Sequence, residues 1–461
     1  MNPFSARSAE VRPPAVADLF YPADAGALAG EVSDHLDQAG ESPLVPGFPK
    51  ALIVPHAGYV YSGPVAASAY DLLRPARGIV RRVVLLGPCH RVSVRGLALP
   101  GAKAFATPLG RVRVDEPAAQ QIRELAQVVE SPAAHAEEHA LEVQLPFLQQ
   151  VLGEFSLLPL VVGDADPEQV AEVLERLWGG AETLIVISSD LSHYHPYELA
   201  RQIDGATVRA ILGFDIGISH DQACGATPVA GALIVAKRHG LRPRLLDCRN
   251  SGDTAGAKDR VVGYASFALE PDGAGYGPDH GRTLLRLARA AIDEAAARES
   301  PAGLADEPWL REWRASFVTL KQGTELRGCV GSLEGQQPLA EDVAANARAA
   351  AYQDTRFKPL APEEFARTEI EVSLLSTPKR LLFEDHGDLI ARLRPGTDGV
   401  ILECDGKRAT FLPQVWEGLP DPEQFVLHLK QKAGIPVDMR TSRCRVKRYT
   451  VLKWSEAGLR S

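Results

Sequence analysis

Short runs of Val, Ile and Leu alternate with longer helical stretches through the first part of this chain. The runs lie at residues 51–55, 82–87, 156–163 and 183–188. Stretches with helical spacing of apolar residues lie between and after them, at 64–73, 116–129, 140–151, 167–178 and 196–212. Continuous apolar strands need cover on both faces, and helical crossovers allow parallel pairing. The pattern therefore predicts an α/β domain whose sheet is covered on both faces and is at least partly parallel.

A cluster of proline and glycine at residues 270–281 divides the chain. Such a composition favours turns and an exposed linker, and 461 residues are too many for one ordinary core. We predict a first domain at 1–272, a linker at 273–282 and a smaller α+β domain at 283–461. The strands expected in the second domain are 315–321, 368–375, 399–403, 408–412 and 445–452, and the helices are 339–351 and 422–433.

The composition excludes several classes of partner. The net charge of −9 argues against nucleic acid, because a phosphate-binding surface needs an excess of basic residues. Since no run approaches the roughly 18 apolar residues of a membrane span, we expect no membrane insertion. The polar start of the sequence does not resemble a secretory signal. The six cysteines form no CxxC pair and no disulfide framework, so a reducing, cytoplasmic location is expected.

Three of the apolar runs lead into a histidine: His56, His90 and His193. The carboxyl ends of parallel strands lie along one edge of a sheet, where ligands bind. These residues are therefore expected to converge although they lie far apart in the sequence. Imidazole is the commonest side-chain ligand for iron, zinc and copper. The sequence predicts a metal site at this edge; the alternative for each histidine is a hydrogen-bonded structural role.

Acidic residues near these histidines are further candidates. His139 and Glu142 are three residues apart and share a helix face, where they would act as a ligand, a proton donor or an orienting partner. Acidic side chains at a helix start offer a purely structural alternative. Asp190 precedes His193 by three residues and is expected to orient a histidine, act as a base or form a turn. Asp253 lies in a Ser-Gly-Asp turn and offers an oxygen ligand or a turn-forming side chain.

Two cysteines also have chemical potential. Cys224 and Gly225 begin an Ala-rich helical stretch, and a thiol at a helix N-terminus is favoured as thiolate; the alternative is a small buried side chain. Cys329 lies between two glycines and is expected to be a nucleophile, a ligand, a redox thiol or a structural residue. No histidine lies near Cys329 in the sequence to activate it, so a covalent mechanism has no support there.

In its first part the chain resembles the Memo family, relatives of the class III extradiol (LigB-type) dioxygenases, which implies an α/β sandwich with a mainly parallel central sheet. The matching segments are RPPAVA at 12–17, FYP at 20–22, PHAGY at 55–59, LGPCH at 86–90, EHALEVQLP at 138–146, SSDLSH at 188–193 and SGD at 251–253. The second part resembles the AMMECR domain family, through FVTL at 317–320, LRGCVG at 326–331, DTRF at 354–357, IEVS at 370–373 and FLPQV at 411–415. Together they resemble proteins B and A of the AmmeMemoRadiSam system, which implies a radical S-adenosylmethionine enzyme as partner.

The resemblance implies that His56 and His90 are metal ligands and that His193 lies in the same pocket. Some Memo relatives have a cysteine as third ligand just after the Ser-Gly-Asp segment, and dioxygenases use a glutamate. This chain has Thr254 there, beside Asp253. Two histidines and a carboxylate suit non-haem Fe(II) with open positions, and copper and zinc are the alternatives.

The leading hypothesis is a metal-dependent, dioxygenase-like oxidoreductase. It would act on an aromatic or phenolic small molecule, or on a peptide product of the radical enzyme. His56 and His90 would hold iron, Asp253 or His193 would complete the ligands, and His139 or His193 would transfer protons. The alternatives are a non-catalytic adaptor that binds a peptide or partner in the same cleft, and a zinc-dependent hydrolase. The second domain is expected to position substrate or partner around Arg327, Cys329 and Asp354.

Overall fold

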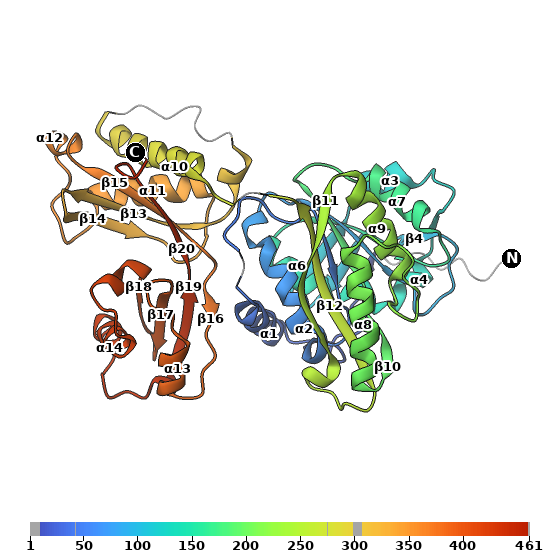
Figure 1. Cartoon of the computed structure of the whole chain (residues 1–461). Helices are drawn as coiled ribbons and strands as arrows, with labels where there is room; N and C mark the ends of the chain where they lie inside the picture. Colours follow the sequence, from blue (N-terminus) through green and yellow to red (C-terminus); the bar gives the residue numbers. More distant parts are fainter. Residues whose placement is uncertain (1–9, 42, 274, 298–306, 460–461) are drawn as a thin grey trace. The chain divides into compact units, whose positions relative to one another are not determined.

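The structure is a computed structural model that describes residues 10–41, 43–273, 275–297 and 307–459 (Figure 1). The described residues fall into two compact units. One unit holds those up to Ala39 together with Phe48–Gly273, and the other holds Gly40–Gly47 together with those after Gly273. Among the described residues, no helix is both long enough and apolar enough to cross a membrane.

The first unit is built on a sheet that has 12 strands among the described residues. Its main path runs β1-β5-β6-β8-β3-β9-β2-β12-β10, with β11 paired to β12 and β4 paired to β7 and β8. The strands are β1 (Val11–Arg12), β2 (Ala51–Val54), β3 (Arg82–Pro88), β4 (Leu97–Leu99), β5 (Ala104–Thr107), β6 (Gly110–Val114), β7 (Val128–Glu130), β8 (Ser156–Val162), β9 (Thr183–Ser188), β10 (His193–His195), β11 (Leu241–Asn250) and β12 (Val261–Pro271).

Helices cover both faces of this sheet. They are α1 (Ala25–Gln38), α2 (Tyr59–Tyr70), α3 (Glu116–Ile122), α4 (Pro132–Ala136), α5 (His139–Glu142), α6 (Leu145–Leu152), α7 (Pro167–Arg176), α8 (Tyr197–Leu212) and α9 (Ala226–Arg238). Successive residues of a strand point to opposite faces. Leu52 and Val54 of β2 therefore join a core with α1, α2 and α6, while Ile53 joins a second core with α7 and α9.

The centre of the sheet is parallel. β2 and β3 each pair in parallel with β9, and β3 also pairs in parallel with β8. The strands β2, β9 and β3 are thus neighbours whose carboxyl ends meet at one edge. The antiparallel strands β11 and β12 lie beyond β2. The predicted α/β fold with a mainly parallel central sheet is confirmed.

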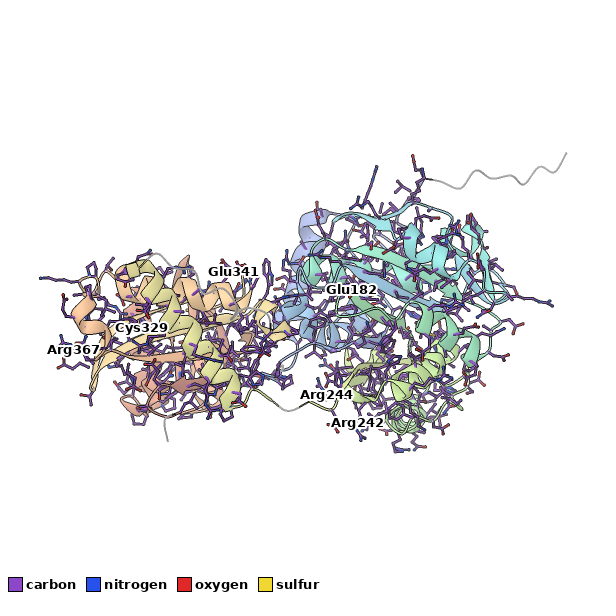
Figure 2. All side chains as sticks on the ribbon, turned by 90° about the horizontal axis from the view of Figure 1, so that it is seen from above. Glu182, Arg242, Arg244, Cys329, Glu341 and Arg367 are labelled. Carbon is purple, nitrogen blue, oxygen red and sulfur yellow. The ribbon has the colours of Figure 1, made fainter. Side chains whose placement is uncertain are left out.

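The second unit contains two antiparallel sheets among its described residues, ordered β14-β13-β15-β20 and β16-β19-β17-β18. The strands are β13 (Ala315–Gln322), β14 (Glu325–Gly331), β15 (Glu369–Leu375), β16 (Lys379–Arg380), β17 (Gly399–Cys404), β18 (Lys407–Phe411), β19 (Arg445–Tyr449) and β20 (Val451–Ser455). The helices are α10 (Pro278–Ala297), α11 (Leu339–Tyr352), α12 (Pro362–Phe365), α13 (His386–Arg392) and α14 (Pro422–Ala433). Cys329 lies in β14 (Figure 2). The unit has the predicted α+β character.

Some boundaries differ from the sequence expectation. Helix α10 begins at Pro278, inside the expected linker 273–282, because proline is well tolerated in a first helical turn. Gly40–Gly47 belongs to the second unit, where the Gly47 amide donates to Glu312 at 2.6 Å. The strand expected at 445–452 is divided at Thr450 into β19 and β20, which belong to different sheets. Thr450 exchanges two hydrogen bonds with Ser376.

A matched pair of glycine substitutions tests the packing of α9 on α7. An added Cβ at Gly231 would lie 2.5 Å from Val170 Cγ1, whereas one at Gly30 in α1 would meet open space. Gly231→Ala is expected to lower the free energy of unfolding by about 1–3 kcal/mol through overpacking. Gly30→Ala should raise it by up to about 1 kcal/mol, since alanine is the better helix former. Equal shifts in urea midpoint would contradict the close packing.

Candidate metal centre

Three neighbouring strand ends bring histidines together in the first unit. His56 follows β2 and His90 follows β3, on either side of β9. Their ring centroids lie 5.2 Å apart, and the ring of His139, at the start of α5, lies 5.5 Å from His56 and 4.8 Å from His90. The convergence predicted for His56 and His90 from their strand ends is present in the geometry.

The hydrogen bonds of His56 determine which of its ring nitrogens carries the proton. His56 is 1% exposed, and its Nδ1 lies 2.8 Å from Ser188 Oγ. That hydroxyl has a single proton, which it donates to the carbonyl of Ala140 at 2.7 Å, so it accepts from His56. The proton of the neutral ring therefore resides on Nδ1 and the lone pair on Nε2. Burial lowers the pKa of His56 to about 3, which keeps the ring neutral.

His90 is oriented in the same manner by Glu138. The backbone N–H of His90 donates to Glu138 Oε2 at 2.7 Å, and its Nδ1 donates to Oε1 at 2.9 Å. Burial alone would raise the pKa of Glu138, but hydrogen bonds from His90 and Ala140 outweigh it and lower this pKa to about 2. The carboxylate is therefore ionised and acts only as acceptor, which leaves Nε2 of His90 free.

Cys224 supplies the third atom of the cluster. Its Sγ lies 3.3 Å from His56 Nε2 and accepts from the backbone N–H of Asp190 at 3.3 Å. The adjacent Gly225 allows the start of α9 to approach the end of β9, since a Cβ there would lie 2.7 Å from Cβ of Ser189. The candidate ligand atoms of His56, His90 and Cys224 all lie within 4.8 Å of one another.

His139 packs against both His56 and His90. Its ring stacks on His90, and the ring of Phe20 packs against it at 4.9 Å. His139 Nδ1 is buried and lies 3.3 Å from Glu138 Oε1 without a hydrogen bond. Burial, assisted by His56, lowers the pKa of His139 to about 4. His139 is thus a neutral imidazole with a buried nitrogen that has no partner.

The donor set fits a transition-metal ion. Two imidazole Nε2 lone pairs and one sulfur face a common point, and each imidazole donates its other N–H to a fixed acceptor. Such outer partners fix the tautomer and orientation of metal-binding histidines. Burial raises the pKa of the Cys224 thiol to about 12, so a cation is needed to hold it as thiolate. Imidazole and thiolate together suit iron, copper and zinc better than magnesium or calcium.

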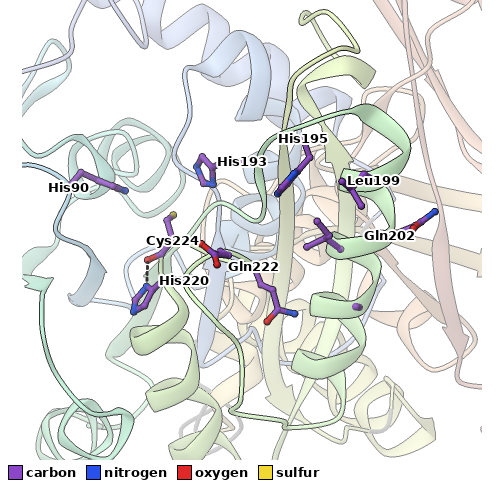
Figure 3. A pocket seen from close by; sticks show the side chains of 11 residues that line it. His90, His193, His195, Leu199, Gln202, His220, Gln222 and Cys224 are labelled. Atoms are coloured by element: carbon purple, nitrogen blue, oxygen red, sulfur yellow. Dashed lines mark hydrogen bonds between the residues drawn. The ribbon is translucent and has the colours of Figure 1, made fainter.

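An open cavity of about 910 Å³ adjoins this cluster (Figure 3). His90, Cys224 and His193 lie at one part of its wall. The remaining lining is mixed, and comprises His195, Leu199, Gln202, Ile203, Ala206, His220, Asp221 and Gln222. A cavity of this size suits a small molecule or one peptide side chain.

Comparison with known proteins assigns both units. A family model described as Memo-like protein matches residues 12–268, more than half of the chain, and a model described as AMMECR1 matches residues 285–454. The chain belongs to the Memo-like protein family. It carries an AMMECR1 domain after its Memo-like domain, and the resemblance expected from the sequence is confirmed.

The curated relatives correspond to the Memo-like domain. A MEMO1 family protein of Ignicoccus hospitalis is 38% identical over 280 residues, covering 56% of this chain and 97% of that protein. A MEMO1 family protein of Aeropyrum pernix is 37% identical over 286 residues, covering 56% of this chain and 100% of that protein.

The solved structure of an uncharacterized protein from Pyrococcus horikoshii is 31% identical, covers 39% of this chain and 93% of its own, and has a TM-score of 0.37.

The Memo-like domain places Asp253 and Thr254 differently from the sequence expectation. Asp253 accepts from Tyr197 Oη at 2.6 Å and from the Asn250 amide at 3.0 Å, so its oxygens serve a turn after β11. Thr254 donates to the carbonyl of Ser251 at 3.2 Å in the same turn. Among the described residues, two candidate ligand groups lie close enough to share an ion: His56, His90 and Cys224, and His90, Glu138 and His139. Neither contains Asp253 or Thr254. Cys224, from a different segment, lies where the third ligand was expected.

Asp190 and His193 lie beside the cluster. Asp190 Oδ1 accepts from the backbone N–H of His56 at 2.7 Å, and burial raises the pKa of this carboxyl. It therefore fixes the main chain that carries His56. His193 lies in β10 and lines the cavity, outside both candidate ligand groups of the described residues. Its position suits contact with a bound molecule.

Glu142 has a structural environment although it shares α5 with His139. It is fully buried and accepts from Arg12 Nη1 at 2.5 Å and Tyr21 Oη at 2.5 Å. It also accepts from the amides of Ala15 and Val16. These bonds fill its acceptor positions with groups of the N-terminal segment. These contacts support a role for Glu142 as an anchor of that segment, and its expected role as a catalytic group stays a prediction.

In the AMMECR1 domain, Cys329 is held by a local polar network. Its amide donates to Asp354 Oδ2 at 2.9 Å, and its carbonyl accepts from Arg356 at 3.0 Å. Its Sγ accepts from Thr319 at 3.3 Å. Arg327 lies in an ion pair with Glu364 at 2.8 Å. This arrangement orders the segment around Cys329 but provides it with no general base.

The anchor role of Glu142 is testable by an isosteric change. Glu142→Gln removes the charge that compensates the buried Arg12, so the free energy of unfolding is expected to fall by about 3–5 kcal/mol. The exposed Glu154→Gln is the control and should change it by less than about 0.5 kcal/mol. Chemical denaturation measures both. A Glu142→Gln protein of normal stability that has lost metal would place Glu142 in the metal centre instead.

Proposed function

We propose that the Memo-like domain binds a redox-active metal ion, Fe(II), through His56, His90 and Cys224, and acts as a dioxygenase-like oxidoreductase. The observation that carries this proposal is the pair of imidazoles whose Nδ1 atoms are held by Ser188 and Glu138, with the Nε2 atom of His56 in contact with the thiol of Cys224. When bound, such a metal supplies electron transfer and polarises a substrate atom.

The cavity and the unused histidines support a role for this chain beyond holding the ion. His193 faces the cavity and His139 lies against the ligand histidines, so both are suited to accept or return a proton during turnover. Leu199, Ile203 and Ala206 offer an apolar wall to an aromatic or phenolic small molecule, or to a peptide side chain.

The identity of the bound metal, and the need for it, distinguish this proposal from its two alternatives. Zinc accepts nitrogen and sulfur ligands in three-residue sites with an open position, which would favour a hydrolase. A non-catalytic adaptor would bind its peptide or partner equally well after metal removal. Turnover that requires iron and oxygen, and is lost under anaerobic conditions, favours the oxidoreductase over both.

We further propose that the AMMECR1 domain presents substrate or partner to this activity, and that a radical S-adenosylmethionine enzyme is that partner in the cytoplasm. The ordered surface around Cys329, Asp354 and Arg356 is the candidate contact. A reconstituted reaction of both proteins tests this role with Cys329→Ser. An unchanged rate would assign Cys329 to structure alone.

Metal content tests the first-domain site directly. His56→Ala, His90→Ala and Cys224→Ser are each expected to reduce the iron content of anaerobically purified protein to background, since each removes one donor. Cys248→Ser changes an exposed thiol and should leave metal content unchanged. Elemental analysis measures iron, copper and zinc together. Equal metal in the three variants and the parent protein would refute the site.

Oxygen consumption tests the reaction class. Iron-loaded protein is expected to consume oxygen with members of a panel of catechols and other phenols, and the His56→Ala protein is not. A zinc-containing protein that is active without oxygen would identify the hydrolase alternative.

The orienting role of Glu138 gives a graded prediction. Glu138→Gln should weaken metal affinity by about 10–100-fold, because the amide holds His90 less firmly than a carboxylate does. The neighbouring Glu137→Gln is the matched control, since Glu137 is exposed. Competition with a chelator measures the affinity. Identical affinities of the two variants would show that Glu138 does not act through His90.

A further inference from the structure

Three sulfur-containing side chains meet inside the AMMECR1 domain, away from Cys329. Cys404 ends β17, Cys444 immediately precedes β19, and Met439 lies in the segment between α14 and β19. Cys404 Sγ lies 3.2 Å from Met439 Sδ. Met439 is one of only two methionines in the sequence, so its place beside a thiol is a distinctive feature of this core.

The antiparallel ladder places the two cysteines opposite each other. In the register of β17 with β19, Glu403 faces Arg445. One step further along the same register, Cys404 lies opposite Cys444, and both side chains belong to one core against which Met439 packs. Directly opposed side chains in such a pair are close enough for direct contact. The three sulfurs therefore form one cluster rather than three separate core side chains.

A buried positive charge lies beside this cluster. Cys404 and Cys444 are 4% and 7% exposed, and Lys430 of α14 is only 5% exposed. The Lys430 ammonium donates to the carbonyl of Met439 at 2.9 Å and contributes a favourable charge to Cys444. Burying an ammonium is costly without a compensating negative charge. An anionic centre at the two sulfurs would provide that compensation.

The cluster is also accessible. A shallow cleft of about 410 Å³ is lined by Cys404 together with Glu403, Asp405, Gly406, Lys407, Arg408, Arg443 and Arg445. Cys404 thus borders the cleft on one side and the sulfur cluster on the other. A small ion has a short route from solvent to the sulfurs.

We propose that Cys404, Cys444 and Met439 form a Cu(I) site in the AMMECR1 domain. Thiolate and thioether are soft ligands that select Cu(I), whereas hard ions such as Mg²⁺ and Ca²⁺ prefer oxygen. On binding, each thiol loses its proton to solvent and two copper–thiolate bonds form, with no change of oxidation state. The resulting centre has one net negative charge, which Lys430 balances. This site is independent of the one proposed for the Memo-like domain.

An anaerobic titration of the reduced full-length chain with Cu(I), against a chromogenic Cu(I) chelator, tests the site. Cys404→Ser and Cys444→Ser are each expected to remove one tightly bound equivalent. Met439→Leu conserves volume and should keep the fold, while weakening Cu(I) binding by tenfold or more. Cys248→Ser is the control thiol and should bind as the parent does. Cys224→Ser, in the first unit, should leave this equivalent in place.

Two further measurements decide the nature of the cluster. X-ray absorption of the Cys224→Ser protein loaded with one equivalent of Cu(I) should show a sulfur-only shell, which is lost from the Cys404→Ser protein. Unchanged affinity and stoichiometry in all three sulfur variants would overturn the proposal. So would a Cys404–Cys444 disulfide that forms in air in a protein whose reduced form takes up no Cu(I), since the pair would then be a redox switch.

Discussion

The single proton of the Ser188 hydroxyl governs the chemistry of the histidine cluster. Because it is donated to the carbonyl of Ala140, Ser188 must accept from both Gln144 and His56. This one-way arrangement fixes the tautomer of a buried imidazole that would otherwise be ambiguous. The serine ends β9, whose parallel pairing with β2 and β3 places all three strand ends at one edge. The pairing of β9 therefore fixes the position of Ser188, and Ser188 in turn fixes the orientation of the His56 ring.

The central sheet and the histidines that follow it were predictable from the sequence. Continuous apolar runs specify strands that are buried on both faces, and a histidine two residues after such a run must lie at the strand's carboxyl end. His56 and His90 follow from this local pattern. Their convergence depends in addition on the strand order that makes β2, β9 and β3 neighbours, and this order is not contained in the local pattern.

The third donor atom was not predictable in the same way. Cys224 reaches the cluster because α9 packs its first turn on the end of β9, and this approach depends on the absence of a side chain at Gly225. Nothing in the spacing of Cys224 signals that tertiary contact. The roles expected for Asp253 and Glu142 rested on their positions near a motif. Such positions give no indication of partners such as Tyr197 or Arg12, which come from distant segments.

The anchoring of the N-terminal segment has a mechanical consequence. Glu142 and His139 occupy the two ends of the single turn that forms α5, and Glu138 precedes it. Arg12 and Tyr21 hold one end of this turn, while the stacked rings of His139 and His90 lie at the other. The segment before α1 is thus bonded to the same short turn that carries His139. A change that breaks the bonds of Arg12 and Tyr21 to Glu142 would therefore be expected to shift the ring of His139 against His90, although neither Arg12 nor Tyr21 belongs to the histidine cluster.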